Sequence, residues 1–399
     1  MKKFLFILMS FTFLQLSCAK KRADDVTPEK SIENLDLKVI SVTHQGNIEH
    51  RDISVLASLL NSPELSARIK YGVSKNKIVY QTTYKGNIIE ASGMIYLPIG
   101  LKEPAPLLSA QHGTTFEKSG APSVSSGMSF YELFASGGYI TFVPDFIGYG
   151  SSAHLFHPYY DQKHSALAVI DLIKTGKKYL KEKNIAFNDK LYLIGYSEGG
   201  YVTLAAQKEI DADPSIGLNL TAVAAGAGGY DLTGMLGDMG KTNYYSYPAY
   251  LAFIIKSFNI TYDWDKPSSY FFKKIYADRV DRTMDGSKGG GEINGLLTTN
   301  LDSLFNPAFY NNIKAGSEIQ FKKALISNSL IDFKVASPLR LYHAKGDEVI
   351  PYQNSIATKS KLEQQGGRAI EIRLSEGGSH GSGLTPMLKD ALPWFESFN

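Results

Sequence analysis

The sequence contains one cysteine in 399 residues, and it carries little net charge. A single cysteine excludes an intrachain disulfide framework and any Cys-rich zinc or iron–sulfur site. The 42 Lys and Arg residues are almost balanced by 39 Asp and Glu residues, which leaves a formal charge of +3. Such a small net charge gives no indication of a nucleic-acid-binding protein. Any chemistry must therefore come from oxygen and nitrogen groups.

Apolar residues are abundant by comparison. They make up 43% of the chain, while charged residues make up 20%. The chain can therefore bury a large core, which argues against a disordered protein. Its length fits one long domain or two short ones.

The N-terminus has the pattern of an export signal. A lysine pair precedes an apolar run over residues 4–16, which is too short for a permanent membrane helix but has the size of a signal-peptide core. Cys18 follows closely, and this arrangement resembles a bacterial lipoprotein signal, in which the cysteine is acylated. We expect a signal peptide over residues 1–17, a flexible tether over 18–36, and a protein that is lipid-anchored in the bacterial envelope, at the outer membrane, or secreted. An ordinary secretion signal with an incidental thiol is the alternative.

From residue 37 onward, strand-like and helix-like segments alternate. Three β-branched and aromatic runs begin the series, at residues 37–43, 77–84 and 88–97, and the turn signal between the last two predicts a hairpin. Apolar runs typical of buried parallel strands follow at residues 106–111, 138–143, 190–195, 221–225, 338–344 and 369–374. Helix-length patterns lie at residues 162–180, 198–210, 352–365 and 386–398. The order predicts an α/β fold with a mostly parallel, doubly wound sheet and antiparallel N-terminal strands.

One stretch breaks this rhythm. Residues 230–332 are rich in aromatics and have no strand and helix alternation. We interpret them as a cap inserted into a core formed by residues 37–229 and 333–399. An ordinary aromatic-rich structural subdomain is the alternative. Nine aromatics of this stretch could line an apolar or carbohydrate-stacking pocket, but we expect most of them to pack the cap against the core. They are Tyr244, Tyr245, Tyr247, Tyr250, Phe253, Trp264, Tyr270, Phe271 and Phe272.

A serine motif lies at the end of one predicted strand. Residues 195–199 read Gly-Tyr-Ser-Glu-Gly, the G-x-S-x-G pattern of a strained strand-to-helix turn that exposes a serine hydroxyl. An apolar strand precedes Ser197 and a helix pattern follows it. Residues 377–381 match the pattern too, but at Ser379 no histidine remains downstream beyond His380. Ser197 is therefore the candidate nucleophile, and Ser379 is a loop residue.

The chain order of the partners identifies the base, because in proteins with this turn the acid and then the histidine follow the serine. Only His343 and His380 come after Ser197, and His343 lies inside an apolar strand. His380 lies on a Gly-rich turn after the last strand, where a loop can carry its imidazole back to the serine.

The acid should hold the other imidazole nitrogen. Asp347 follows the strand at residues 338–344 and is our first choice. Glu348 is the nearest rival. Because it is the next residue in the chain, Asp347 and Glu348 cannot both point at His380 from one turn. Asp332 precedes the strand and is the third choice.

An acyl-transfer site also needs donors for the developing oxyanion. The backbone N–H of Glu198, directly after the nucleophile, is one donor by geometry. The backbone N–H of Thr114, in the loop after the strand at residues 106–111, is our choice for the second, with that of Gly113 in reserve. His112 in the same loop is expected to have a structural role.

Other polar residues are given structural interpretations. Asp145 is either a functional carboxylate or, in the interpretation we favour, an acid that fixes its loop through backbone amides. His154, His157 and His164 have no zinc-type spacing and are interpreted as surface or loop residues, so no metal site is predicted. The acidic, Gly-rich stretch 285–292 is interpreted as a flexible cap loop instead of a calcium site.

The motifs at residues 112–114, 144–150 and 195–200 together resemble the α/β-hydrolase superfamily, in its branch of secreted bacterial lipases and esterases. The resemblance runs from about residue 37 to the C-terminus. It implies serine-dependent hydrolysis of carboxylic esters through an acyl-enzyme, with no cofactor and with lipid, carbohydrate or small esters as substrates. The membrane is a further expected partner, through the lipid anchor.

Two other functions fit the same motifs. A prolyl-type serine peptidase would use the same residues, but its relatives often carry a β-propeller before the catalytic domain, and no repeat of blade length is present here. A binding protein on an inactive hydrolase scaffold is the third hypothesis, since a fold never proves a function. An intact Ser, Asp, His order argues against it.

Overall fold

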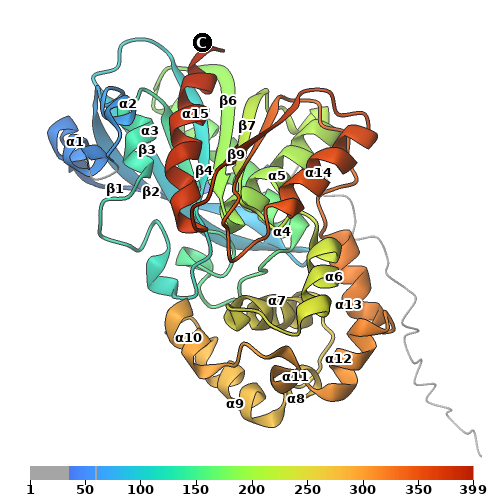
Figure 1. Ribbon diagram of the computed structural model, residues 1–399. Coiled ribbons are helices and arrows are strands. Elements are labelled where there is room, and N and C mark those ends of the chain that lie inside the picture. The colour runs from blue at the N-terminus through green and yellow to red at the C-terminus, as the bar shows by residue number, and fades with distance from the viewer. Residues whose placement is uncertain (1–35, 59–60, 399) are drawn as a thin grey trace, which may run out of the picture. The chain divides into compact units, whose positions relative to one another are not determined.

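The computed structural model describes residues 36–58 and 61–398. The predicted signal peptide, Cys18 and all of the predicted tether except Asp36 lie outside the described residues. The described chain is built on one mixed sheet with strand order β1-β2-β3-β5-β4-β6-β7-β8-β9 (Figure 1).

The N-terminal strands form an antiparallel meander. It consists of β1 (Val39–Ile48), β2 (Gly72–Tyr84) and β3 (Asn87–Ile99), and β3 pairs antiparallel with β5. The predicted hairpin lies between β2 and β3, where Lys85 and Gly86 both have positive φ, 50° and 75°. Positive φ at both central positions is the conformation of a type I′ turn, whose twist matches the strands that it joins.

The remaining strands run parallel to one another. They are β4 (Ala105–Gln111), β5 (Ile140–Pro144), β6 (Phe187–Tyr196), β7 (Leu220–Gly226), β8 (Leu339–Ala344) and β9 (Ile370–Ser375). The prediction of a mostly parallel sheet with antiparallel N-terminal strands is confirmed. All carboxyl ends of these strands meet at one edge, which is where open α/β sheets place their sites.

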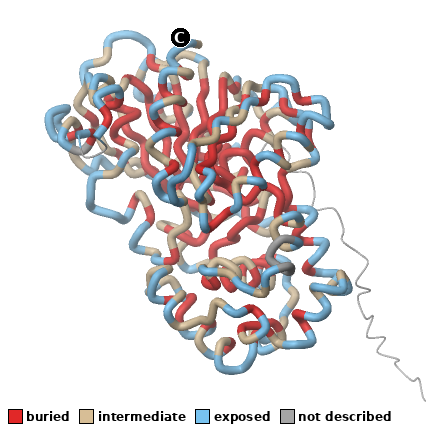
Figure 2. Tube along the Cα trace, viewed as in Figure 1, coloured by how far each residue is buried: buried red, intermediate tan, exposed pale blue. Residues whose placement is uncertain are grey.

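Helices cover both faces of the sheet. On one face lie α4 (Gln162–Glu182), α5 (Glu198–Ala212) and α14 (Gln353–Gln364), and on the other lie α1 (His50–Ser58), α2 (Pro63–Ser66), α3 (Tyr131–Ser136) and α15 (Leu384–Glu396). Leu107 and its neighbour Leu108 are both buried, one in each core. Covered faces explain why the parallel strands are almost continuously apolar, and Figure 2 shows the buried residues concentrated along them.

Between β7 and β8 the chain forms helices and loops, with two isolated β-bridges between residues 244 and 300 and between residues 272 and 305. The helical segment, residues 232–327, contains α6 (Leu232–Thr242), α7 (Pro248–Thr261), α8 (Ser268–Phe271), α9 (Lys274–Thr283), α10 (Gly290–Leu296), α11 (Leu301–Leu304), α12 (Pro307–Lys314) and α13 (Ile319–Ser327). These helices gather below the sheet in Figure 1. Several are too short for a periodic pattern, which explains why the sequence shows no rhythm here. The division between core and cap stays a prediction.

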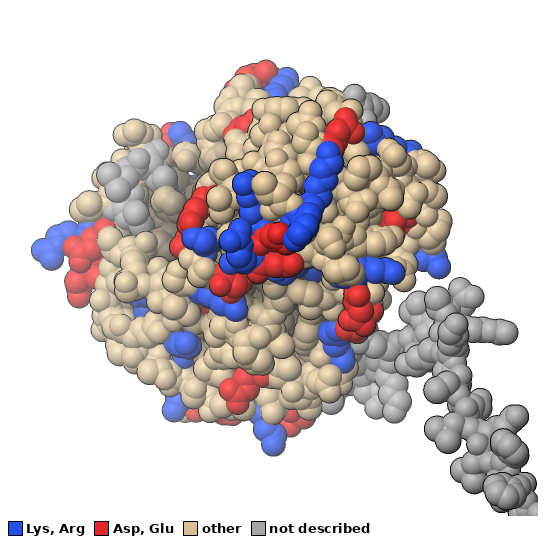
Figure 3. All heavy atoms as spheres, turned by 90° about the horizontal axis from the view of Figure 1, so that it is seen from below, with Lys and Arg blue, Asp and Glu red and all other residues tan. Residues whose placement is uncertain are grey.

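Charges of both signs are interspersed on the face seen in Figure 3. The helical segment itself carries exposed ion pairs, such as Lys274 with Asp278 and Lys288 with Glu292. Within residues 36–58 and 61–398, no helix combines the length and the apolarity that crossing a membrane requires.

Candidate active site

Ser197 occupies a sharp turn between β6 and α5. Its backbone has φ 61° and ψ −126°, a conformation that is strained for a residue with a side chain. The turn is possible because Gly199 lies against the end of β4: a Cβ on Gly199 would stand 2.1 Å from the carbonyl oxygen of Gln111. The Ser197 N–H donates to the Gly226 carbonyl oxygen at 2.9 Å, which fixes the turn on β7.

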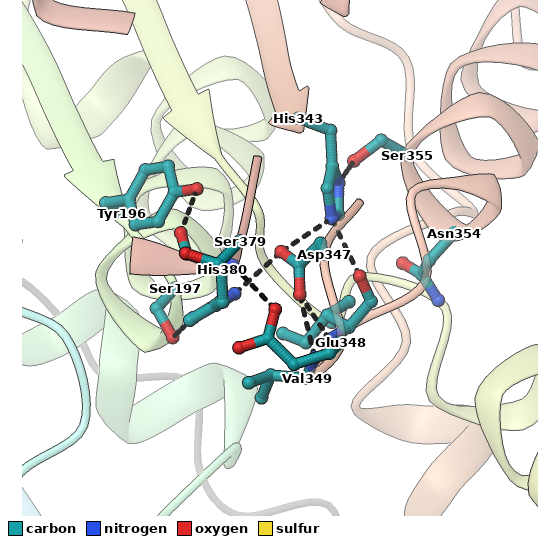
Figure 4. Close-up of polar contacts among 12 residues, drawn as sticks. Tyr196, Ser197, His343, Asp347, Glu348, Val349, Asn354, Ser355, Ser379 and His380 are labelled. Carbon is teal, nitrogen blue, oxygen red and sulfur yellow. Dashed lines mark hydrogen bonds and ion pairs between the residues drawn. The ribbon is translucent and has the colours of Figure 1, made fainter. Parts of the chain in front are cut away.

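His380 reaches this serine from the loop after β9. Its Nε2 lies 2.8 Å from Ser197 Oγ and its Nδ1 lies 2.7 Å from Asp347 Oδ2 (Figure 4). A carboxylate accepts hydrogen bonds only, so Nδ1 carries the proton and Nε2 is free to accept the serine hydroxyl proton. The Tyr196 hydroxyl donates to the His380 carbonyl oxygen at 2.7 Å, which ties the loop to the end of β6.

Asp347 lies in the loop after β8, and its side chain is fully buried. Its Oδ1 accepts the backbone N–H groups of Val349 and Ile350 at 2.9 and 2.8 Å. Its Oδ2 faces both His380 and the Nε2 of His343, the latter at 3.1 Å. Burial alone would raise the pKa of Asp347, but the hydrogen bonds from His343 and His380 and the charge of His380 outweigh it and hold this pKa well below its usual range.

The two rival acids have other partners. Glu348 Oε2 accepts the backbone N–H of His380 at 3.0 Å and its Oε1 accepts the Tyr247 hydroxyl at 3.2 Å, so this side chain holds the histidine loop and not the imidazole. Asp332 forms an ion pair with Lys208 at 2.7 Å and is exposed. Of the three acids, Asp347 is the one that the structure brings to the His380 ring.

The predicted oxyanion loop runs beside the serine. A Cβ on Gly113 would stand 3.6 Å from Ser197 Cβ, so Gly113 lies within contact distance of the turn. Thr114 is held there by its Oγ1, which lies 2.9 Å from the Tyr159 hydroxyl. The ring nitrogens of His112 face the carbonyl oxygens of Gly113 and Asp145 at 2.8 and 3.2 Å, which fits the structural role expected for it.

Asp145 is buried in the loop after β5. Its Oδ1 accepts the Ser123 N–H at 2.8 Å, and its Oδ2 accepts the hydroxyls of Ser92 and Ser123. It therefore fixes its own loop against β3 and against the chain before α3, as the favoured interpretation expected.

Two of the three histidines interpreted as surface or loop residues are buried. His157 lies in a loop, as expected, whereas His164 lies in α4, so the interpretation is wrong for His164. His157 is 6% exposed and its Nε2 lies 2.6 Å from Glu198 Oε1. His164 lies in the first turn of α4, where its Nδ1 is 2.7 Å from Asp161 Oδ1. Only His154 is exposed. No group of three His, Cys, Asp or Glu side chains within residues 36–58 and 61–398 is arranged to hold a metal ion.

The His157–Glu198 pair is a feature that the sequence analysis missed. Glu198, the residue after Ser197, has a buried side chain, and the His157 Nδ1 lies 2.7 Å from the Ile147 carbonyl oxygen. The two residues are 41 positions apart. The available signal was the position of Glu198 in the first helical turn behind the serine, where a buried carboxylate requires a partner.

The helical segment contacts the loops around Ser197. The Phe253 ring on α7 stacks on that of Tyr159, with centroids 4.6 Å apart, and it also lies against Phe116. On the other side, the Tyr245 hydroxyl donates to the Val349 carbonyl oxygen at 3.2 Å. Of the nine aromatics of this stretch, Phe253, Phe271 and Phe272 are buried and Tyr244 is 57% exposed. The other five are partly buried: Tyr245, Tyr247, Tyr250, Trp264 and Tyr270.

Solved structures share this architecture. A protein of Legionella pneumophila that is provisionally assigned as a hydrolase is 26% identical, with a TM-score of 0.83 over 90% of this chain and 98% of that one. The rice cell wall degrading esterase LipA of Xanthomonas oryzae is 23% identical, with a TM-score of 0.78 over 90% and 96%. Lipase A of Candida antarctica in its closed state is 16% identical, with a TM-score of 0.64 over 91% and 83%. The last two show the α/β-hydrolase fold alone.

At the level of sequence, no curated protein matches the chain. A protein family does: residues 123–397, more than half of the chain, match the secretory lipase family. The expectation of a carboxylic ester hydrolase of the lipase and esterase type is confirmed at this level. The chain belongs to the secretory lipase family.

Proposed function

We propose that the protein hydrolyses carboxylic esters through a covalent acyl-enzyme formed on Ser197, with His380 as general base and acid and Asp347 as its orienting carboxylate. The observation that carries the proposal is the unbroken series of hydrogen bonds from Ser197 Oγ to His380 and from His380 to Asp347, at 2.8 and 2.7 Å. The series begins at Ser197, which has a strained backbone at the carboxyl end of β6. Such strain is typical of a serine nucleophile on a strand-to-helix turn.

Acylation would begin with attack of Ser197 Oγ on the ester carbonyl carbon while the hydroxyl proton passes to His380 Nε2. Asp347 stabilises the imidazolium that forms. The backbone N–H groups of Glu198 and Thr114 would hold the oxyanion, and removal of one such donor typically costs about 3 kcal/mol of barrier. The carbon–oxygen bond to the alcohol then breaks, and the alcohol leaves with the proton from His380.

Deacylation repeats these steps with water as the nucleophile. Water gives a proton to His380 Nε2 as it attacks the acyl-serine carbonyl carbon. When the tetrahedral intermediate collapses, the acid is released and Ser197 Oγ recovers its proton from His380. No atom or electron is needed from any other group.

Residues 230–332 are proposed to act as a cap over this site. Support comes from contacts of the helical segment with both sides of the serine: Phe253 with the Tyr159 loop, and Tyr247 with Glu348. A cap in this position would select among acyl and alcohol groups.

A series of p-nitrophenyl esters from acetate to palmitate tests the proposal. The chain without its predicted signal peptide is assayed beside Ser197→Ala, with a prolyl-peptide anilide included. We expect ester turnover that Ser197→Ala abolishes with an unchanged melting curve, and an optimum chain length that separates a small-acyl esterase from a lipase. Turnover of the anilide alone would contradict the proposed esterase function and favour a peptidase. No observation on the described residues supports a peptidase.

We also propose that Cys18 is acylated and anchors the protein to the envelope. Membership of a secretory family supports export, and the apolar run before Cys18 supports the lipoprotein pathway. Expression in a bacterium with labelled palmitate, followed by detergent phase partition, tests this. The natural chain should carry label and enter the detergent phase, whereas Cys18→Ala should do neither. An unlabelled natural chain would leave simple secretion as the answer.

A further inference from the structure

A second imidazole contacts the proposed catalytic acid. His343 is the penultimate residue of β8, and its Nε2 lies 3.1 Å from Asp347 Oδ2, the same oxygen that faces His380 (Figure 4). The same Nε2 lies 2.9 Å from the Ile350 carbonyl oxygen, and the Nδ1 lies 2.7 Å from Ser355 Oγ in α14. His343 therefore joins three elements: β8, the acid loop and α14.

The surroundings fix the proton on His343. Both oxygens near Nε2 belong to a carbonyl and a carboxylate, which accept but do not donate. The Nε2 atom must therefore carry a proton, which is donated to the Ile350 carbonyl oxygen while Asp347 Oδ2 lies 3.1 Å from the same nitrogen. The Nδ1 atom can then accept the Ser355 hydroxyl proton, so the ring is held at both ends.

Water cannot replace this contact. The side chains of His343 and Asp347 both have 0% exposure, and Ser355 is fully buried as well. A buried carboxylate that loses a donor pays the full cost of desolvation, because no solvent molecule is at hand. Ile350 adds to the clamp, since its N–H donates to Asp347 Oδ1 while its carbonyl oxygen accepts from His343.

We propose that His343 is a positioning residue for ester hydrolysis, which holds the Asp347 carboxylate in the orientation that His380 needs and competes with His380 for Oδ2. The inference rests on the proposed function, because it assigns His343 a role only through Asp347. His343 touches neither the substrate nor the reacting atoms in this role.

The role has two separable consequences. Loss of the donor should release Asp347 from its orientation and lower kcat by about 10- to 100-fold, the range expected for one hydrogen bond to a charged group, with little change in KM. Loss of the donor also leaves more negative charge on Oδ2, so protonation of the His380 ring becomes easier. The acidic limb of the pH profile of kcat/KM should then move to higher pH.

Other groups around His380 stay in place during this change. They are Glu348, which accepts the His380 N–H, and Tyr196, whose hydroxyl donates to the His380 carbonyl oxygen. Neither contacts His343 through a hydrogen bond or ion pair that the structure records. The shift of the pH profile therefore reports on Asp347.

Three variants of the full chain test the inference on p-nitrophenyl butyrate. His343→Leu removes both nitrogens, His343→Gln keeps an N–H donor of similar reach, and Ser355→Ala removes only the partner of Nδ1. We expect the largest fall in kcat and the largest shift of the acidic limb for His343→Leu, with partial rescue in His343→Gln. Ser355→Ala should shift the profile in the same direction by less. If His343→Leu fails to fold, the other two variants still test the inference.

A double-mutant cycle with Asp347→Asn separates positioning from general damage. If His343 acts through Asp347, adding His343→Gln to Asp347→Asn should lower kcat no further than Asp347→Asn does alone. Equal losses from His343→Gln in both backgrounds, or losses with an unmoved pH profile, would overturn the inference. Ester turnover that survives Ser197→Ala would instead overturn the proposed function, so the two failures are distinguishable.

Discussion

His380 Nε2 lies 2.8 Å from Ser197 Oγ although the two residues are 183 positions apart in the chain. The contact exists because β6 and β9 are parallel strands of one sheet, and the loops after both strands open at the same edge. In the chain, the helical segment lies between β7 and β8 and contributes no strand to this sheet. The site is thus positioned by the sheet, while what approaches the site depends on the helices.

Substitutions at Asp347 and at Glu348 should have very different effects on kcat. Asp347→Asn should lower kcat by about 10⁴-fold with little change in KM, as for the buried acid of serine proteases, because the imidazole loses its correct tautomer. Glu348→Gln should cost much less, since Glu348 binds only the backbone of His380. Steady-state kinetics on one soluble ester measures both. An equal or larger loss for Glu348→Gln would transfer the role to Glu348.

Asp171 should make stability depend on pH. It is buried in α4, accepts the Thr82 hydroxyl at 2.6 Å, and burial raises its pKa from 3.8 to about 6 against the lowering effect of that bond. The folded state therefore binds more protons between pH 4 and pH 6, so stability falls as pH rises through this window. Asp171→Asn should add up to about 3 kcal/mol at pH 8 and almost nothing at pH 4.

Urea unfolding at several pH values checks this, with the exposed Asp189→Asn as control. A difference between Asp171→Asn and the natural chain that stays constant from pH 4 to pH 8 would contradict the assignment of Asp171.

The buried His157–Glu198 pair beside Ser197 should matter for stability. His157→Leu leaves the Glu198 carboxylate without its partner at 2.6 Å, and breaking a buried ion pair in this way costs about 3–5 kcal/mol. Adding Glu198→Gln should restore part of the loss, because no charge then remains buried. His154→Leu, at an exposed histidine, is the control. A double variant as unstable as His157→Leu would show that packing and not charge dominates.

The close approach at Gly199 should tolerate no side chain. Because a Cβ there would stand 2.1 Å from the Gln111 carbonyl oxygen, Gly199→Ala must push α5 away from β4. We expect a loss of at least about 1–3 kcal/mol and of ester turnover. Gly291→Ala in α10 meets no atom within 4 Å, so it should leave turnover unchanged and should raise stability by at most about 1 kcal/mol. Thermal melts and ester turnover of the two variants test this prediction. A Gly199→Ala variant that melts and turns over ester like Gly291→Ala would contradict it.

Local sequence patterns predicted the parts of the fold that depend on local rules. The strand at residues 190–195 is apolar because both faces of β6 are covered, and the motif at residues 195–199 marks a turn whose glycines lie inside the pattern itself. The Lys85–Gly86 turn is equally local. Chain order then led to His380 and Asp347 as partners of Ser197, and the structure brings their side chains together.

Contacts across the fold could not be predicted in the same way. The interpretation of His157 as a surface or loop residue overlooked a partner 41 positions away, which only the packing of the loop before α4 against α5 reveals. His343 was correctly placed in an apolar strand, yet its role depends on how the chain turns after β8 to bring Asp347 back. The helices α8 and α11 have four residues each, too few for a periodic pattern.

Covalent labelling with a p-nitrophenyl phosphonate tests the central claim most directly. Attack of the nucleophile on phosphorus displaces p-nitrophenolate and leaves a stable phosphonyl group on one side chain. The account predicts one phosphonyl group per chain, located by peptide mass spectrometry on Ser197, and no label on Ser197→Ala. Label on another residue, or ester turnover that persists in a fully labelled Ser197, would contradict it.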